Sequence, residues 1–213
     1  YIVCSILYPF YSQLDNQARM DVLIVIAIIV FLITMNGLYV AGEFSTISAR
    51  RSRLLQMLEE KESKPLVLLL PYVSDVHLLD RYMAACQIGI TISSLVLGFY
   101  GQANLTEMLT PALTQFGALA GPAASSISAI VVLALLTVLQ VVLGELVPKN
   151  IGGQYPERLA LLTVRFVHWS LMLFRPLIWV FNGSGHFILR LLGVQATNEH
   201  VHLHAPEEIA ILV

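Results

Sequence analysis

The sequence predicts an all-α membrane protein with three transmembrane helices per subunit, short helices on the cytosolic side and a juxtamembrane belt of amphipathic helix. Hydrophobic residues make up 57% of the 213 residues and charged residues only 12%, whereas roughly 25% of a soluble domain is charged. Three apolar stretches are each close to the roughly 20 residues that a helix needs to cross the hydrocarbon core. The cations gather in alternate connections, as they do in multi-span proteins.

The three predicted crossings differ in polarity. The first, residues 21–42, is almost continuously apolar, whereas the second, residues 81–100, is rich in small and polar residues. The third covers residues 125–148 and ends in GELVP. Residues 50–70 are charged at first and then apolar over a short length, so we expect helices at the cytosolic surface there.

Positive charges predict the orientation, because Lys and Arg near the ends of crossings stay in the cytoplasm. Six of them lie between the first and second crossings, five follow the third, and the expected loop over residues 102–124 contains none. We therefore predict an N-terminus outside and a C-terminus in the cytoplasm. Residues 1–20 form an extracytoplasmic segment in this scheme, since their apolar run is too short to cross.

Residues 158–194 are apolar again but carry several cations. Arg158, Arg165 and Arg175 fall within an arc of about 100° on a helix, which is typical of an amphipathic helix at the membrane surface. Pro176 is expected to break or kink this helix. The alternative is a fourth crossing over residues 177–192, which is short, contains NGSGH and would carry the C-terminus outside.

The remaining tail, residues 195–213, looks like a polar linker that leads into a new helix, whereas residues 21–194 form the transmembrane domain. His200, His202 and His204 alternate in this linker. We expect them to be ordinary solvated residues, and a transition-metal site is the alternative.

Small and polar residues recur along all three crossings at the three- or four-residue spacing of one helix face. The members are Thr34, Gly37, Ala41, Ser45 and Ser48 in the first; Gln87, Thr91, Ser94, Gly98 and Gly101 in the second; and Thr137, Gln140, Gly144 and Pro148 in the third. Asn36 and Glu43 lie roughly opposite the first stripe. Such stripes either pack helices together or, where they converge beside a carboxylate, line a cation site.

The end of the third crossing favours the second interpretation. Pro148 has no N–H and its ring clashes with the carbonyl of Gly144, so it is predicted to free that oxygen beside the carboxylate of Glu145. Freed carbonyls at membrane depth are tolerated where they line a cavity, and transporters use them as cation ligands. Carboxylate, hydroxyl and carbonyl oxygens suit hard cations such as magnesium or sodium.

Four segments together resemble the transmembrane domain of the CorC/CNNM family of magnesium transporters. They are MNGLYVAGEFSTISARRSRL (35–54), QIGITISSLVLGFYG (87–101), VVLGELVPKNIGGQYPERLAL (141–161) and the tail HLHAPEEIAILV. The resemblance implies a homodimer in the plasma membrane, the inner membrane of bacteria. It implies that magnesium is exported, that sodium entry drives the export, and that ATP is bound only by cytosolic CBS domains beyond residue 213.

The resemblance also implies ligands for the magnesium ion. The motifs place a ligating serine at Ser45 and a glutamate at Glu145, with a backbone oxygen from Gly144 or from an unwound stretch through Gly152. Related sequences carry asparagines where this one has Ile90 and Ser94, and isoleucine cannot ligate a cation. We therefore add hydroxyls from the polar face, and the predicted metal ligands are Ser45, Thr91, Ser94, Gly144 and Glu145.

Other functions fit the sequence less well. The main alternative is a non-transporting membrane sensor or scaffold dimer that regulates ion homeostasis through cytosolic domains. An enzyme is not expected, because Ser184 and His186 form no recognisable catalytic dyad. A nucleic-acid partner has no support either, since the net charge is -2 and no basic patch occurs.

Overall fold

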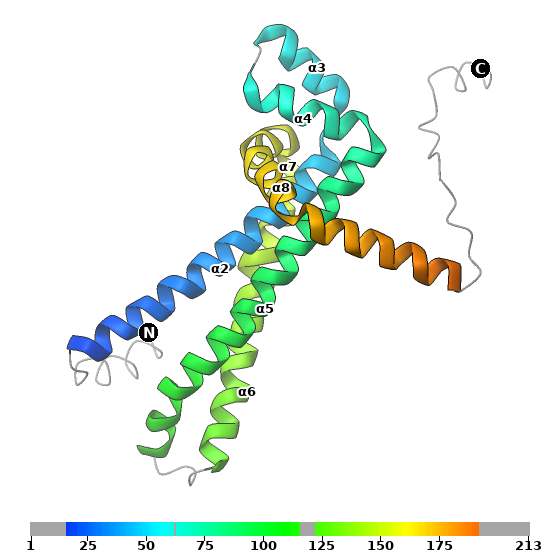
Figure 1. The fold of residues 1–213 in the computed structure, drawn as a ribbon. Coiled ribbons are helices and arrows are strands. Elements are labelled where there is room, and N and C mark those ends of the chain that lie inside the picture. Colours follow the sequence, from blue (N-terminus) through cyan, green and yellow to red (C-terminus); the bar gives the residue numbers. More distant parts are fainter. Residues whose placement is uncertain (1–15, 62, 116–121, 192–213) are drawn as a thin grey trace, which may run out of the picture. The chain divides into compact units, whose positions relative to one another are not determined.

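The computed structural model describes residues 16–61, 63–115 and 122–191, and within these ranges the chain is helical throughout, apart from short connections (Figure 1). No β-strand occurs in the described ranges, which confirms the all-α fold class. The chain divides into two compact units, Tyr1–Phe174 and Arg175–Val213. The packing described below lies within the first unit.

The helices follow one another with short connections. They are α2 (Asn16–Ser48), α3 (Arg51–Glu60), α4 (Lys64–Ser74), α5 (Val76–Gln115), α6 (Pro122–Leu139), the π-helix η1 (Gln140–Leu146), α7 (Val147–Gln154) and α8 (Pro156–Leu191). The predicted crossings lie in α2, in α5 and along α6 and η1 into α7. Residues 50–70 form short helices, as expected.

Four of the described helical segments are long and apolar enough to cross a membrane, by length and composition. They are Arg19–Ser48, Val76–Pro111, Ala123–Gln154 and Pro156–Phe181. The protein is therefore a multi-pass membrane protein, and α8 is the segment on which a count of three or four crossings depends.

One expectation about the ends of helices is wrong. Residues 102–115 do not form a loop, because α5 continues through them to Gln115. Three polar side chains there, those of Asn104, Thr110 and Thr114, donate to carbonyls of the same helix. Leu105 and Leu109 pack on a buried apolar cluster. Of the two outcomes expected at Pro176, a break does not occur, because α8 continues to Leu191; a single proline removes only one backbone N–H from a long helix.

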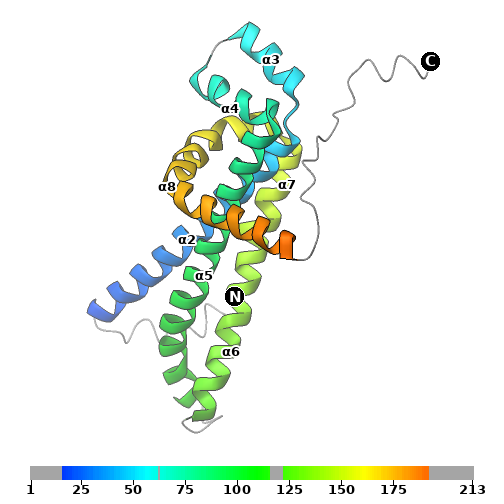
Figure 2. The ribbon, with the colours of Figure 1, turned by 45° about the vertical axis from the view of Figure 1, so that its right-hand side comes forward.

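Other helices of the first unit pack on two faces of α2. One face of α2 lies against α5, and the other lies against η1 and α7. α5 and α6 run side by side in both views (Figures 1 and 2). α2 is thus buried from two directions over its middle and C-terminal part.

Two apolar clusters hold this arrangement. One joins α2, α5 and α6 near the start of α2 and consists of Val25, Ile29, Ile33, Leu97, Val132 and Leu136. The other joins α3, α4, the start of α5 and the first half of α8, and it includes Leu54, Leu66, Leu69, Tyr82, Val164 and Val167. The candidate site lies on α2 between these two clusters.

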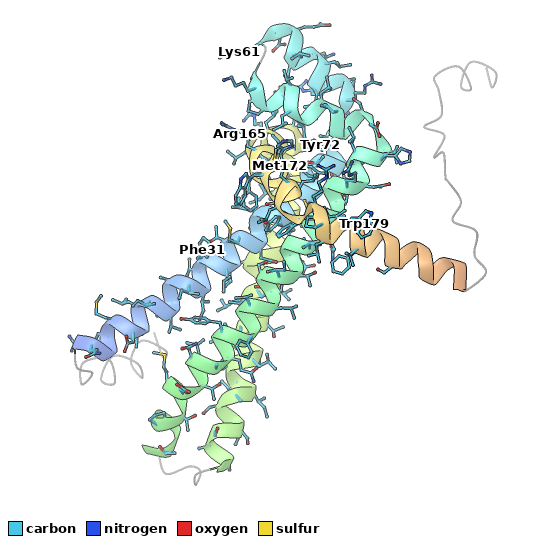
Figure 3. The ribbon with its side chains drawn as sticks, viewed as in Figure 1. Phe31, Lys61, Tyr72, Arg165, Met172 and Trp179 are labelled. Carbon is cyan, nitrogen blue, oxygen red and sulfur yellow. The ribbon has the colours of Figure 1, made fainter. Side chains whose placement is uncertain are left out.

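Large apolar side chains remain exposed along the outside of the long helices. Phe31 on α2 is 58% exposed (Figure 3) and Phe99 on α5 is 82% exposed. A protein surrounded by water rarely exposes so much apolar surface, whereas lipid tails solvate it readily. These surfaces agree with helices that face a membrane.

Candidate cation site

A buried asparagine connects three helical elements. Asn36 on α2 is only 2% exposed, and its Nδ2 donates a hydrogen bond of 2.9 Å to the carbonyl oxygen of Gly144 in η1. Its Oδ1 accepts from the hydroxyls of Ser93 and Ser94 on α5, at 3.0 and 3.2 Å. One amide therefore links α2, α5 and η1, and we call this group of residues, together with Gln140, the Asn36 hub.

Gln140 extends the hub along η1. Its Nε2 donates to Ser94 Oγ at 2.8 Å, while its Oε1 is buried and has no hydrogen-bond partner among the described residues. A Cβ atom built on Gly144 would lie 3.0 Å from Asn36 Nδ2 and 3.6 Å from Gln140 Cδ. Glycine at this position therefore leaves room for both amides beside the backbone.

The backbone of η1 explains why a carbonyl is available there. In an α-helix the carbonyl of Gly144 would accept from the residue four positions later, but that residue is Pro148, which has no N–H. The chain adopts the wider π-helical turn instead, in which Val147 N–H donates to the carbonyl of Val142. Gly144 then offers its oxygen to a side chain, as the position of Pro148 predicts.

The predicted unwound stretch through Gly152 is wrong, because α7 is helical from Val147 to Gln154. Pro148 lies in the first turn of α7, where its missing N–H costs nothing and its fixed φ suits the helix. The π-helical turn supplies the released carbonyl without a break in the chain.

The predicted ligands occupy different places. Ser94 and Gly144 meet in the Asn36 hub. Thr91 is exposed and donates to the carbonyl of Gln87 in its own helix at 2.8 Å. Ser45 is fully buried and donates to the carbonyl of Gly42 at 3.3 Å.

Ser45 faces α7, away from the hub. A Cβ built on Gly152 would lie 3.3 Å from the backbone nitrogen of Ser45 and 3.5 Å from the carbonyl of Ala41, and one built on Gly37 would lie 3.1 Å from Pro148 Cγ. These members of the first stripe therefore pack α2 against the segment that follows η1. Nine residues separate Asn36 from Ser45, which is about 13 Å along a helix axis.

Glu145 follows Gly144 in η1 and carries the only carboxylate of the predicted ligand set. Its side chain is exposed, and no hydrogen bond or ion pair joins it to another residue in the described ranges. The neighbouring cation Lys149 lies over the ring of Phe44, with Nζ 4.5 Å from the ring centre. Glu145 thus neighbours the hub residue Gly144 in the sequence, but its exposed carboxylate makes no hydrogen bond to the hub among the described residues.

Sequence reasoning missed Asn36 and Ser93 as members of this group. Asn36 lies opposite the stripe that contains Ser45, and a stripe is normally taken to mark the buried face. The signal that identifies it is the residue type itself, because an amide inside an apolar crossing is costly unless it has partners in the bundle.

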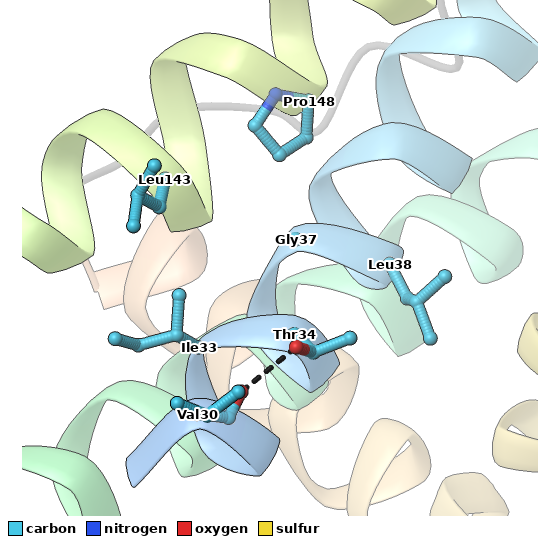
Figure 4. Close-up of a pocket in the computed structure, with 7 residues that line it drawn as sticks. All are labelled: Val30, Ile33, Thr34, Gly37, Leu38, Leu143 and Pro148. Carbon is cyan, nitrogen blue, oxygen red and sulfur yellow. Dashed lines mark hydrogen bonds between the residues drawn. The ribbon is translucent and has the colours of Figure 1, made fainter. Parts of the chain in front are cut away.

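A separate groove beside the hub is not suited to a cation. It has a volume of about 350 Å³, and its lining residues are Val30, Ile33, Thr34, Gly37, Leu38, Leu143 and Pro148 (Figure 4). Its single hydroxyl, that of Thr34, already donates to the carbonyl of Val30 at 2.8 Å (Figure 4). Of the predicted ligands, Ser94 and Gly144 belong to the hub and not to this groove.

The members of the hub are neutral and include no His, Cys, Asp or Glu side chain. No group of three or more His, Cys, Asp or Glu side chains that could hold a metal occurs within residues 16–61, 63–115 and 122–191. The predicted segments over residues 1–15 and 195–213, with the alternating histidines, lie outside the described residues. What the hub offers is two amide groups, two hydroxyls and a backbone carbonyl.

A comparison with protein families shows which family the chain belongs to. The model of the cyclin M transmembrane N-terminal domain matches residues 27–213. The chain belongs to the cyclin M (CNNM) family. The matched region contains the whole Asn36 hub and the GELVPK segment, and the family relationship makes the chain a membrane protein of the CorC/CNNM type, as the four quoted segments predict.

Curated relatives support the CNNM assignment. UPF0053 protein YhdT of Bacillus subtilis is 34% identical over 193 residues, which is 91% of this chain and 40% of YhdT. UPF0053 protein YrkA of the same organism is 32% identical over 186 residues, 87% of this chain and 42% of YrkA. Protein MT1889 of Mycobacterium tuberculosis is 36% identical over 180 residues, 84% of this chain and half of MT1889. The chain thus spans two fifths to one half of the length of these relatives.

Proposed function

We propose that this CNNM-family protein carries magnesium ions out of the cytosol, in exchange for sodium, through a site between α2, α5 and η1. The observation that carries the proposal is the carbonyl of Gly144, which Pro148 releases and which a buried side chain, Asn36, contacts at 2.9 Å. An intramembrane carbonyl that faces polar groups of two other helices is the type of ligand that transporters use for cations.

The charge of a divalent ion calls for a carboxylate as well. Magnesium is usually held by one or two carboxylates together with neutral oxygens and retained waters. Glu145 supplies this charge in our proposal, next to the Gly144 carbonyl, and Ser94 supplies a hydroxyl. Thr91 and Ser45 lie apart from this pair and bond to carbonyls of their own helices, so they are not ligands of the ion in this arrangement.

We further propose three crossings per subunit, with the N-terminus outside and α8 at the cytosolic surface of the plasma membrane. Arg158, Arg165 and Arg175 on α8 are all exposed, and cations on one face of a helix are far less costly at the headgroups than in the hydrocarbon. We also propose that the protein forms a homodimer and that ATP-binding CBS domains control it, as the resemblance to the CorC/CNNM family implies.

Magnesium flux from proteoliposomes tests the proposal. The Glu145→Gln variant keeps the size of the side chain but removes its charge, so we expect export to fall at least about tenfold, the usual cost of losing a metal-site group. Glu107→Gln on α5, also exposed, is the matched control and should transport normally. Normal flux in Glu145→Gln, with an intact fold and oligomeric state, would exclude this site.

A sensor or scaffold dimer is the second candidate. It is favoured by the closed hydrogen bonds of the hub, since Asn36, Ser93 and Ser94 satisfy one another without an ion. This function predicts no magnesium flux from liposomes that contain the native chain, even at a steep magnesium gradient. The flux measurement on the native protein therefore separates the two functions before any variant is made.

A further inference from the structure

The orientation of the Asn36 amide is fixed by its partners. A backbone carbonyl can only accept a hydrogen bond, so the group that faces Gly144 O must be the nitrogen, Nδ2. The hydroxyls of Ser93 and Ser94 then donate to Oδ1. In this arrangement the Asn36 group beside Gly144 O is an N–H donor, which cannot ligate a cation.

We propose that the Asn36 amide turns over by half a rotation about its Cβ–Cγ bond when magnesium binds, so that Oδ1 replaces Nδ2 beside Gly144 O and becomes a ligand. This inference rests on the proposed function, because it assumes that the ion is held at the Gly144 carbonyl. In this inference Asn36 is a magnesium ligand, and its N–H group donates to Gly144 O when no magnesium is bound.

The distance between the two groups fits a magnesium ion. Rotation of a planar amide exchanges its oxygen and nitrogen, so Oδ1 would take a position close to the 2.9 Å that now separates Nδ2 from Gly144 O. Neighbouring ligands of an octahedral ion with bonds of 2.0–2.1 Å lie about 2.9 Å apart. Two such oxygens repel each other in the absence of a cation, so the turned amide is stable only with the ion bound.

The hydroxyl of Ser93 can accommodate the reversed amide. Ser93 Oγ lies 2.8 Å from the carbonyl of Gly89 and 3.0 Å from that of Ile90, in addition to its contact with Asn36. A hydroxyl has only one proton, which can point to one of these carbonyls and leave a lone pair for Asn36 Nδ2. The turned amide therefore keeps a partner for its N–H group within the same hub.

The side-chain oxygen of Gln140 is a further neutral group that could ligate a cation. Buried carbonyl oxygens of side chains nearly always have a partner, yet Gln140 Oε1 is buried and has none among the described residues. Its amide carbon lies 3.6 Å from the position of a Cβ on Gly144. Gln140 thus offers one more neutral oxygen beside the two that the rotation would bring together.

Two substitutions of Asn36 test its two roles, as a hydrogen-bond donor and as a magnesium ligand, separately. Asn36→Asp keeps an oxygen beside Gly144 O but removes the N–H groups, so the magnesium-free protein should unfold at a lower temperature and the stabilisation by added magnesium should increase. Asn36→Leu has a similar volume and no oxygen, so its magnesium affinity should fall by about tenfold or more. Calorimetric titration with magnesium chloride and thermal unfolding, both on the full chain in detergent, measure these effects.

Asn104→Asp is the matched control, because Asn104 Nδ2 donates only to Tyr100 in its own helix, and it should match the native protein in magnesium affinity. Ser93→Ala retains Asn36 but removes the partner of the turned amide, so it should also weaken magnesium binding and serves if an Asn36 variant fails to fold. The inference would be overturned, with the proposed function intact, if Asn36→Leu bound magnesium as tightly as the native protein or more tightly. Native magnesium affinity in Ser93→Ala would overturn it in the same way. A native protein that binds no magnesium would overturn the proposed function as well.

Discussion

The packing of α2 on α5 changes in character between two neighbouring levels, three residues apart along α2. At the first level lie Asn36 and Ser93, whose contacts are hydrogen bonds between small polar groups. At the second level the ring of Tyr39 lies directly on Gly89, so closely that a Cβ at Gly89 would overlap the ring. The same two helices are thus joined by exchangeable hydrogen bonds at one level and by rigid contact at the next.

At the second level, Tyr39 also contacts α8. Tyr39 OH and the hydroxyl of Ser170 on α8 are hydrogen-bonded at 2.9 Å. The ring centroids of Tyr39 and Phe166 are 4.7 Å apart. A closely packed aromatic ring is harder to rearrange than an amide, whose two ends have nearly the same size. The rigid level therefore keeps α2 and α5 at constant spacing while the hub exchanges partners.

Substitution of Gly89 should have the largest effect, because it breaks the rigid level. In Gly89→Ala the new methyl group has no space unless the Tyr39 ring or the helices move, and overpacking of this kind costs about 1–3 kcal/mol. Gly98→Ala on the same helix is the control, because no atom lies within 4 Å of its Cβ position. Thermal unfolding in detergent should show a large decrease for Gly89→Ala and no decrease for Gly98→Ala; equal stabilities would mean that the two levels do not differ in rigidity.

Gly144→Ala tests the exchangeable level. Its methyl group would lie 3.0 Å from Asn36 Nδ2. The end of the Asn36 side chain can move away more easily than the packed ring of Tyr39. The gain in helix propensity, about 1 kcal/mol, should offset most of the cost, so we expect nearly native stability. Magnesium affinity should nevertheless fall, because the amide is displaced from the carbonyl; a calorimetric titration checks this, and a large loss of stability would show that the hub is rigid too.

Much of the fold follows from local chemistry. The crossing in α2 is predicted by an apolar run of the right length, and Pro148 predicts an available carbonyl at Gly144. The continuation of α5 to Gln115 is less evident, because threonine and asparagine are typical of loops as well as of helices. These side chains bond to carbonyls one turn earlier, as Asn104 does, and such bonds leave no periodic pattern in the sequence.

The hub itself depends on packing that one helix face cannot reveal. A single stripe suggests one buried face, but α2 is covered on one side by α5 and on the other by η1 and α7. The stripe with Gly37 and Ser45 faces α7. Asn36 lies on the opposite side of α2 and is buried as well, in contact with α5 and η1. The π-helical turn is also hidden, because one extra residue in a turn changes the register of the side chains without changing their types.

Tyr39→Phe sharpens the comparison at the rigid level by removing one hydrogen bond and keeping the ring. The bond to Ser170 contributes about 0.5–1.5 kcal/mol, and Ser170 retains its bond to the carbonyl of Phe166 at 3.1 Å. We therefore expect a small decrease in thermal stability and native magnesium affinity. A decrease as large as that of Gly89→Ala would show that the hydroxyl, and not the ring contact, fixes this level.

The smallest effect is expected further from the hub, where Tyr72 on α4 contacts α8. Tyr72 OH lies 2.6 Å from His168 Nδ1, and burial raises the pKa of the Tyr72 phenol, an effect that Arg81 opposes only in part.

Because the folded state then holds this proton more tightly than the unfolded state, stability is complete below the ordinary tyrosine pKa of about 10 and is lost as the pH rises through the folded value. Tyr72→Phe cannot lose that proton, so its unfolding free energy should fall less steeply than that of the native protein between about pH 9 and pH 11. Tyr155→Phe, at an exposed tyrosine, should keep the native slope. A Tyr72→Phe profile parallel to the native one would show that this contact does not sense pH, and that α4 is held on α8 by apolar packing around Leu69 and Val164.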